Sequence, residues 1–224
     1  MATHHQDSMK TVAVYSRKGG SGKSTVSIHV AVAASAALRV ILIDADPQAT
    51  VSTWGLERAS NLSRTAPLVA RCDPGSIAEA LAAASAEGFE LAVVDCPPHA
   101  AAGTMDLLRT ADHIVIPVQA SMPDLAATQR SVAMARGVDK SFSFVVNRAS
   151  PRAPEVEQAL ATLGMTGPVS PITLGDRRAF ARALIDGHAV TEFAPRGAKA
   201  VLEVQAYWTW LEPHIKEQEA WQAV

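Results

Sequence analysis

Cysteine and aromatic residues are scarce in this chain, and long hydrophobic runs are missing. Its 224 residues include two cysteines, Cys72 and Cys96, and aromatic side chains make up 5% of the total. Two thiols cannot build a disulfide framework or a four-ligand zinc site, and they suit a reducing cytosol. The longest charge-free stretch near the start, residues 25–38, is broken by polar side chains and falls short of a membrane span. We therefore expect a cytoplasmic protein without a secretory signal.

Net charge is also small. The chain has 20 Lys+Arg against 22 Asp+Glu, a formal charge of −2, and 48% of its residues are apolar. This composition is typical of a globular protein and excludes disorder or coiled coil as a global description. The balanced charge also argues against a uniformly basic surface that binds nucleic acid, but it is compatible with a local basic patch on one face. The length suits one domain over residues 10–224, with residues 1–9 as an extension or a cloning remnant.

Short runs rich in valine and isoleucine alternate with alanine-rich segments along the chain. We expect strands at residues 11–15, 40–43, 68–71, 91–95, 113–117 and 142–147, with a short one near Val169. We expect helices at residues 24–37, 76–86, 101–110, 124–136, 154–163, 176–186 and 197–210. Such alternation is typical of a parallel sheet covered on both faces, with right-handed crossovers. The predicted fold class is a single doubly wound, mostly parallel α/β domain.

A glycine-rich loop follows the first expected strand and leads directly into the first helix. From Arg17 to Thr25 it reads Arg-Lys-Gly-Gly-Ser-Gly-Lys-Ser-Thr. In this context the glycines let backbone N–H groups surround a phosphate, Lys23 reaches the β- and γ-oxygens, and the Ser24 hydroxyl ligates Mg²⁺. The predicted nucleotide-binding residues of the loop are Lys18, Gly19, Gly20, Ser21, Gly22, Lys23, Ser24 and Thr25.

The loop departs from the general P-loop pattern, because Arg17 stands where the first glycine is expected and Lys18 is an additional lysine. In this it resembles the deviant Walker A loop of the ParA/MinD superfamily, and most closely the small plasmid-type, ParF-like partition ATPases. The resemblance implies a P-loop ATPase with ATP and Mg²⁺ as cofactors. It also implies an ATP-dependent homodimer in which Lys18 reaches the phosphates bound by the other subunit. A second cation there would neutralise charge on the transferred phosphoryl group.

Three aspartates stand at the carboxyl ends of two expected strands, where ligands bind in open α/β sheets. Asp95 fits a Walker B carboxylate that holds Mg²⁺ partly through water. The segment Asp46-Pro47-Gln48 resembles that of small plasmid-partition ATPases, which implies that Asp46 orients the attacking water and that Asp44 supports the metal and the loop. Capping of a helix or turn is the alternative for Asp44 and Asp46. The predicted catalytic residues are Lys18, Lys23 and Asp46, and the predicted metal site is Ser24, Asp44 and Asp95.

Asn147 ends the strand expected at residues 142–147. By itself an asparagine at this place is typical of a turn. The resemblance instead implies contact with adenine, for which an amide supplies both a donor and an acceptor. The chain near Pro171 would then close over the base.

Basic residues gather in the second half of the chain. Residues 125–200 carry ten basic and six acidic side chains, and Arg178 and Arg182 share one face of an expected helix. The resemblance implies DNA binding without sequence preference, through phosphate contacts that weaken with salt. A solvated face is the alternative. The predicted DNA-binding residues are Arg177, Arg178, Arg182, Arg196 and Lys199.

The resemblance extends over essentially the whole chain and implies a nucleoid-associated ATPase. Its ATP dimer would bind nonspecific DNA and position a plasmid, a chromosome or another large cargo, with slow hydrolysis stimulated by a ParB-like or other adaptor protein. The alternatives are an ATP-dependent biosynthetic ligase of the same superfamily, a MinD-like positioning ATPase and a regulatory partner that binds ATP without hydrolysis.

The composition of the two ends of the chain indicates which partners are not expected. Residues 215–224 carry one Lys and two Glu, a poor match to acidic lipid, so we expect no membrane partner. About ten residues precede the first expected strand, too few for a helix-turn-helix domain. We therefore expect no operator-specific DNA binding.

Overall fold

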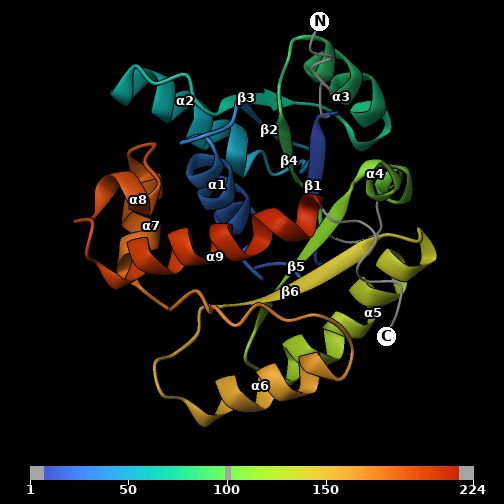
Figure 1. Ribbon diagram of the computed structural model, residues 1–224, viewed down its shortest axis with the longest axis vertical. Helices are drawn as coiled ribbons and strands as arrows, with labels where there is room; N and C mark the ends of the chain where they lie inside the picture. The colour runs from blue at the N-terminus through green and yellow to red at the C-terminus, as the bar shows by residue number, and fades with distance from the viewer. Residues whose placement is uncertain (1–7, 99–101, 217–224) are drawn as a thin grey trace, which may run out of the picture.

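The structure is a computed structural model that describes residues 8–98 and 102–216. Its centre is a six-stranded parallel sheet with the strand order β3-β2-β4-β1-β5-β6 (Figure 1). The strands are Lys10–Val14 (β1), Val40–Asp44 (β2), Leu68–Arg71 (β3), Leu91–Asp95 (β4), His113–Gln119 (β5) and Ser141–Asn147 (β6). Because β1 lies in the interior of the sheet between β4 and β5, the loop that follows it opens at the point where the strand order reverses.

Helices cover both faces of the sheet, which confirms the predicted fold class. One face carries α1 (Lys23–Ala34), α2 (Thr50–Leu62), α7 (Arg178–Ile185), α8 (Val190–Phe193) and α9 (Lys199–Lys216). The other face carries α3 (Ile77–Ala86), α4 (Thr104–Thr110), α5 (Met122–Gly137) and α6 (Pro154–Gly164). A short 3₁₀ turn, Pro74–Ser76, precedes α3.

The inner strands are apolar on both sides, as strands between two helical layers must be, whereas the edge strand β3 has no buried residue. In β1, Val12 and Val14 face one buried cluster, whereas Ala13 faces the other together with Tyr15, the residue that follows the strand. Each fully buried aliphatic side chain of this kind stabilises the fold by about 1.5–3 kcal/mol. The two clusters hold the sheet rigidly, so the polar side chains at its carboxyl edge have fixed positions.

Several expected elements differ from those in the structure. Helix α2 was not expected, because only Val51, Trp54 and the charged Arg58 among its residues are buried. The short strand expected near Val169 is wrong, since Val169 forms only an isolated bridge with Phe144. The helix expected at residues 101–110 begins at Thr104 within the described residues, and α9 continues past the expected end at residue 210 to Lys216. Residue 101, residues 1–7 and most of 215–224 lie outside the described parts.

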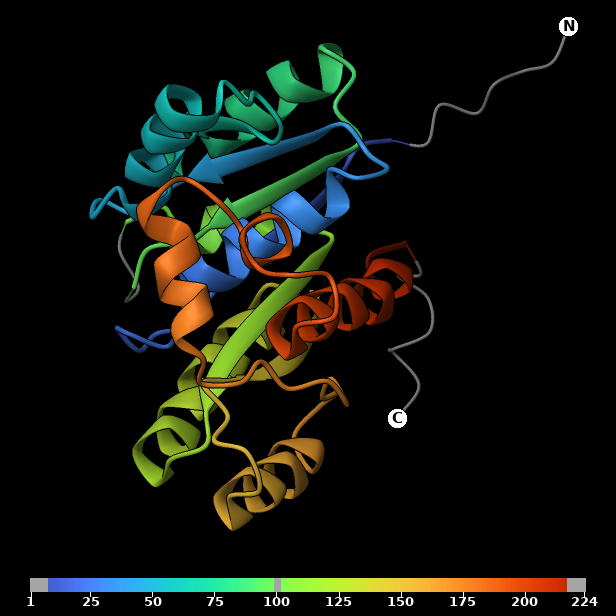
Figure 2. The same ribbon diagram turned by 90° about the vertical axis from the view of Figure 1, so that its left-hand side faces the viewer.

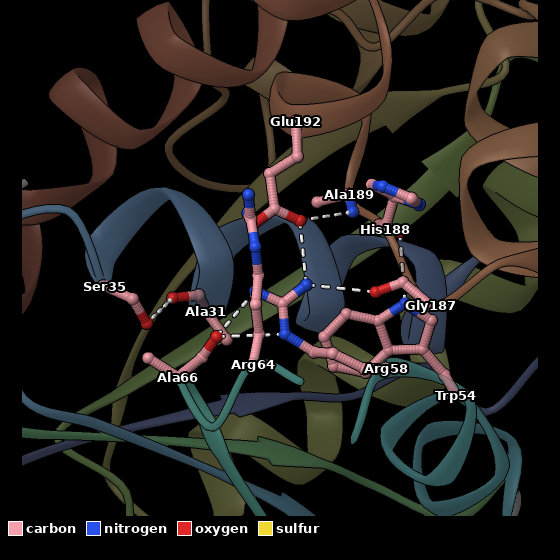
Figure 3. A network of polar contacts seen from close by, with 10 residues as sticks. All are labelled: Ala31, Ser35, Trp54, Arg58, Arg64, Ala66, Gly187, His188, Ala189 and Glu192. Atoms are coloured by element: carbon pink, nitrogen blue, oxygen red, sulfur yellow. Dashed lines mark hydrogen bonds and ion pairs between the residues drawn. The ribbon is translucent and has the colours of Figure 1, made fainter. Parts of the chain in front are cut away.

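A buried network fastens α2 to α8 and to the segment that precedes α8 (Figure 3). The Arg58 guanidinium, on a residue 3% exposed, donates to Glu192 through two hydrogen bonds of 2.8 Å and also to the carbonyls of Ala66 and Gly187. The Trp54 ring lies against this guanidinium, 5.1 Å from ring centroid to Cζ. Gly187 has φ +74°, and a Cβ there would lie 2.4 Å from the Arg58 backbone. We call Arg58, Glu192 and the two carbonyls the Arg58 clasp.

No helix within residues 8–98 and 102–216 is long and apolar enough to cross a membrane.

Candidate functional site

The glycine-rich loop joins β1 to α1 at the carboxyl edge of the sheet. Gly20 has φ +76° and Gly22 has φ +94°, backbone conformations that a residue with a side chain adopts only under strain. A Cβ on Gly19 or Gly20 would meet no heavy atom within 4 Å. The inner rim of the loop is therefore bare backbone at a helix N-terminus, which is the arrangement that binds phosphate. The predicted phosphate cradle fits the structure.

Two amide side chains brace this loop from the neighbouring strands. Gln119 ends β5 and Asn147 ends β6, and the two residues are paired in register. Gln119 Nε2 donates to the Gly20 carbonyl at 2.7 Å, and Asn147 Nδ2 donates to the Ser21 carbonyl at 3.1 Å. A Cβ on Gly22 would lie 1.9 Å from Asn147 Nδ2, so only glycine admits this contact. With both carbonyls held by amides, the loop is fixed in one conformation.

Gln119 was not among the predicted site residues. The strand expected at residues 113–117 stops before it, whereas β5 extends to Gln119, and Asn147 was selected by the resemblance and not by its place at a strand end.

The Ser24 hydroxyl and the Asp95 carboxylate meet directly. Ser24 Oγ donates to Asp95 Oδ2 at 2.6 Å, and Ser27 Oγ donates to Oδ1 at 3.1 Å. Burial raises the pKa of Asp95 to about 7, against the opposing effects of the Ser24 hydrogen bond and the nearby Lys23 ammonium. A cation bound beside this carboxylate would favour its charged form.

Asp44 and Asp46 organise the loop that follows β2. Asp44 is fully buried and stands in register with Asp95 on the adjacent strand. Its Oδ1 accepts the Asp46 N–H at 3.1 Å and its Oδ2 accepts the Ser52 N–H, in the first turn of α2, at 2.7 Å. Asp46 is 8% exposed and its Oδ1 accepts the Gln48 N–H at 2.9 Å. Both aspartates thus cap backbone donors and lie at the same sheet edge as the glycine-rich loop.

The donor set at this edge suits Mg²⁺. Its predicted members, Ser24, Asp44 and Asp95, offer one hydroxyl and two carboxylates, which are hard oxygen ligands. Among the described residues no group of three or more His, Cys, Asp or Glu side chains forms a metal cage. Magnesium does not require such a cage, because it keeps several of its water ligands and takes only one or two ligands from the protein.

Lys18 forms an ion pair with a residue of α5. Its Nζ lies 2.5 Å from Asp124 Oδ2, in the first turn of α5. Lys23, by contrast, is buried at the start of α1, with 6% of its surface exposed. The structure therefore brings Lys23, Ser24, Asp44, Asp46 and Asp95 together at one edge of the sheet and places Lys18 at the rim.

The predicted DNA-binding residues lie in two different environments. Arg178, Arg182, Arg196 and Lys199 are exposed. Arg177 is tied to Glu203, whose two carboxylate oxygens each lie 3.1 Å from its Nε, and this pairing raises its pKa. Helix α7, which carries Arg178 and Arg182, stands at the edge of the sheet where the strands end (Figure 2).

Comparisons with known proteins identify the family of the chain. A family model described as the CobQ/CobB/MinD/ParA nucleotide binding domain matches residues 12–190. The maintenance of carboxysome distribution protein A of Halothiobacillus neapolitanus is 30% identical over 201 residues, which cover 87% of this chain and 92% of that protein.

Solved structures show the same fold. The ATP complex of an McdA variant from Cyanothece superposes with a TM-score of 0.75 at 15% identity, over 96% of this chain and 99% of that one. MinD from Pyrococcus horikoshii, solved with Mg-ADP, gives a TM-score of 0.74 at 14% identity, over 95% and 99%. With the family model covering most of its length, the chain belongs to the CobQ/CobB/MinD/ParA nucleotide-binding domain family.

Proposed function

We propose that this protein is a Mg²⁺-dependent ATP hydrolase of the ParA type that dimerises when it binds ATP. The observation that carries the proposal is that Lys23, Ser24, Asp46 and Asp95 lie at one edge of the sheet, with a second lysine, Lys18, in the same loop. Within one subunit this second lysine forms an ion pair with Asp124. A nucleotide sandwiched between two subunits uses it to neutralise the transferred phosphoryl group.

Each residue then has a defined task. The backbone N–H groups from Gly19 to Thr25 and the Lys23 ammonium bind the phosphates. The Ser24 hydroxyl, which donates to Asp95 in the structure, would hold the metal together with the Asp95 and Asp44 carboxylates, in part through water. When bound, Mg²⁺ offsets negative charge on the β- and γ-phosphates. Asp46 orients the attacking water from a loop that Asp44 keeps in place.

Asn147 would serve both the loop and the base. Its amide gives one N–H to the Ser21 carbonyl, and its oxygen accepts the Arg148 N–H at 2.9 Å. An amide has a second N–H and a second oxygen lone pair. We propose that this second N–H and this second lone pair form hydrogen bonds with the edge of adenine.

We propose nonspecific DNA as the surface on which the dimer moves, in the cytoplasm and on the nucleoid. The exposed Arg178, Arg182, Arg196 and Lys199 support this, with Arg177 held in place by Glu203. The cargo is a large assembly. A plasmid or a chromosome fits this role. A carboxysome fits it equally, because one relative is named for carboxysome distribution. An adaptor protein, ParB-like or of another kind, would stimulate hydrolysis.

The test is ATP hydrolysis by the purified chain with and without Mg²⁺, duplex DNA and the product of the adjacent gene. We expect slow Mg²⁺-dependent phosphate release that rises when DNA and the adaptor are both present. A Lys23→Ala variant should show none, whereas Lys140→Ala, which alters a lysine outside the site, should match the natural protein. Phosphate release that requires a carboxylic acid co-substrate would support a biosynthetic ligase and overturn the proposal.

A further inference from the structure

Two hydroxyl groups of α1 hold the two oxygens of the Asp95 carboxylate separately. Ser24 Oγ lies 2.6 Å from Oδ2, and Ser27 Oγ lies 3.1 Å from Oδ1. Residues three apart on a helix share one face, so both hydroxyls reach the end of β4 from the same side. Ser24 is partly exposed in the first turn of α1, whereas Ser27 is fully buried. Oδ1 is therefore held in the interior, and Oδ2 lies on the side of the glycine-rich loop.

The Ser27 hydroxyl has two acceptors within reach. Its Oγ lies 3.0 Å from the Lys23 carbonyl oxygen, the contact that a helical serine commonly makes four residues back. A hydroxyl has one hydrogen to donate, so the carbonyl and Asp95 compete for it. The carboxylate is the stronger acceptor, because hydrogen bonds to an ionised group are about twice as strong as those between neutral groups. The hydroxyl therefore serves to hold Asp95.

The other carboxylate at this edge of the sheet is held by the backbone. Asp44 Oδ1 accepts the Asp46 N–H, and its Oδ2 accepts the Ser52 N–H. A change of side chain cannot remove either of these donors. Asp95 is instead held by side chains, so a single substitution can release one of its oxygens.

We propose that Ser27 is a positioning residue that leaves one oxygen of Asp95 to face the metal and so makes the site select Mg²⁺ over Ca²⁺. The inference rests on the proposed function and adds its ion specificity. Calcium takes more oxygen ligands than magnesium and accepts both oxygens of one carboxylate, whereas magnesium is smaller and keeps several of its waters. With Oδ1 held by Ser27, the carboxylate offers Oδ2 alone. This suits Mg²⁺ and withholds the two-oxygen contact that Ca²⁺ accepts.

Replacement of Ser27 with alanine tests this directly. The change removes the donor to Oδ1 and places a good helix former in α1. In calorimetry, we expect the natural chain to bind Mg-ADP more tightly than Ca-ADP. The ratio of the Ca-ADP to the Mg-ADP dissociation constant should fall about fivefold in Ser27→Ala. A site that was only loosened would bind both complexes more weakly and keep the ratio, so an unchanged ratio overturns the proposal.

Two further variants are matched controls. Ser35, the C-cap of α1, donates to the Ala31 carbonyl at 2.7 Å, so Ser35→Ala removes a similar hydroxyl at the far end of the same helix and should leave the ratio unchanged. Ser27→Thr keeps the hydroxyl and should keep the selectivity, and its loss there would count against the proposal. Should Ser27→Ala fail to fold, Ser27→Cys is expected to lower the ratio, because a thiol of similar size is a weak donor.

The result for Ser27 can be separated from that for the proposed function. A natural chain that binds Mg-ADP but hydrolyses no ATP would refute the proposed hydrolase, and the ratio in Ser27→Ala would still decide the role of this residue. A natural chain that hydrolyses ATP but binds Mg-ADP and Ca-ADP equally well would overturn the selectivity alone.

Discussion

Replacing Arg58 with methionine tests the Arg58 clasp. The variant keeps an apolar stem of similar length beside Trp54 but removes every hydrogen bond that the guanidinium makes. In the natural protein those bonds go to the Glu192 carboxylate and to the carbonyls of Ala66 and Gly187. Glu192, whose side chain is 13% exposed, is left without its main counter-charge. Helix α2 then loses its attachment to α8 and to the segment that precedes α8.

The expected loss of stability is large. Removing one partner of a buried ion pair costs about 3–5 kcal/mol, and hydrogen bonds from a charged donor to carbonyls are worth about 1.5–3 kcal/mol each. These terms share one side chain and do not simply add. We expect the free energy of unfolding to fall by roughly 4–6 kcal/mol, against a typical total of about 5–15 kcal/mol. At about 2–4 °C per kcal/mol for a chain of this size, Tm falls by roughly 10–20 °C.

The same network predicts a dependence on acid. Burial alone would raise the pKa of Glu192, but hydrogen bonds from Arg58, from the Ala189 N–H and from Arg64 hold this pKa at about 2, below the ordinary 4.5. The native carboxylate therefore binds fewer protons than the unfolded one. Its contribution, about 3 kcal/mol, is complete above pH 4.5 and is lost as the pH falls toward 2.

Urea unfolding, followed by circular dichroism at pH 7, 5, 4 and 3, measures both effects. The difference in unfolding free energy between the natural chain and Arg58→Met should be largest at pH 7 and should shrink on acidification. The control is Arg64→Met, since Arg64 is 53% exposed and contacts the same carboxylate, and exposed pairs contribute about 0–1 kcal/mol. Two results would refute the reasoning. One is an equal loss of unfolding free energy in Arg58→Met and Arg64→Met, and the other is a difference between the natural chain and Arg58→Met that stays constant from pH 7 to pH 3.

Three further variants probe the site. Asp46→Ala should retain the ATP dimer but lose phosphate release, and normal turnover would exclude a catalytic role. Gln119→Leu should raise the dissociation constant for ATP about tenfold in calorimetry. The Gly20 carbonyl loses a hydrogen bond between neutral groups, worth about 1 kcal/mol, and the loop is no longer held by Gln119. Unaltered affinity for ATP would contradict this role of Gln119. Arg178→Ala with Arg182→Ala should weaken DNA binding and reduce the slope of log affinity against log salt by about 2, so an identical salt titration would exclude this patch.

Local patterns were enough to predict most of the sheet and the loop. Five of the six strands are short apolar runs that are mostly buried, and β3 is an exposed edge strand. All six agree with the expected ranges to within two residues at their ends. The glycine-rich loop is likewise a local signal, because Gly20 and Gly22 need positive φ and Lys23 begins the helix directly after them.

Contacts between distant parts of the chain escaped prediction. Helix α2 has too few apolar positions to show a helical period, and its key buried residue, Arg58, is charged. Its stability comes instead from Glu192, 134 positions away. The pairing of Lys18 with Asp124 and the hydrogen bond from Gln119 to Gly20 span comparable distances. Only the fold reveals such partners, since Glu192, Asp124 and Gln119 belong to no sequence motif.

The bracing of the loop by Gln119 and Asn147 bears on when the protein becomes able to bind nucleotide during synthesis. A nascent chain that has emerged as far as β4 already carries Lys18, Lys23 and Asp95. The donors to the Gly20 and Ser21 carbonyls arrive only with the ends of β5 and β6. Affinity for ATP should therefore appear after both later strands have joined the sheet. ATP would then selectively stabilise chains whose sheet is complete, because a ligand that binds only the folded state shifts the equilibrium toward it.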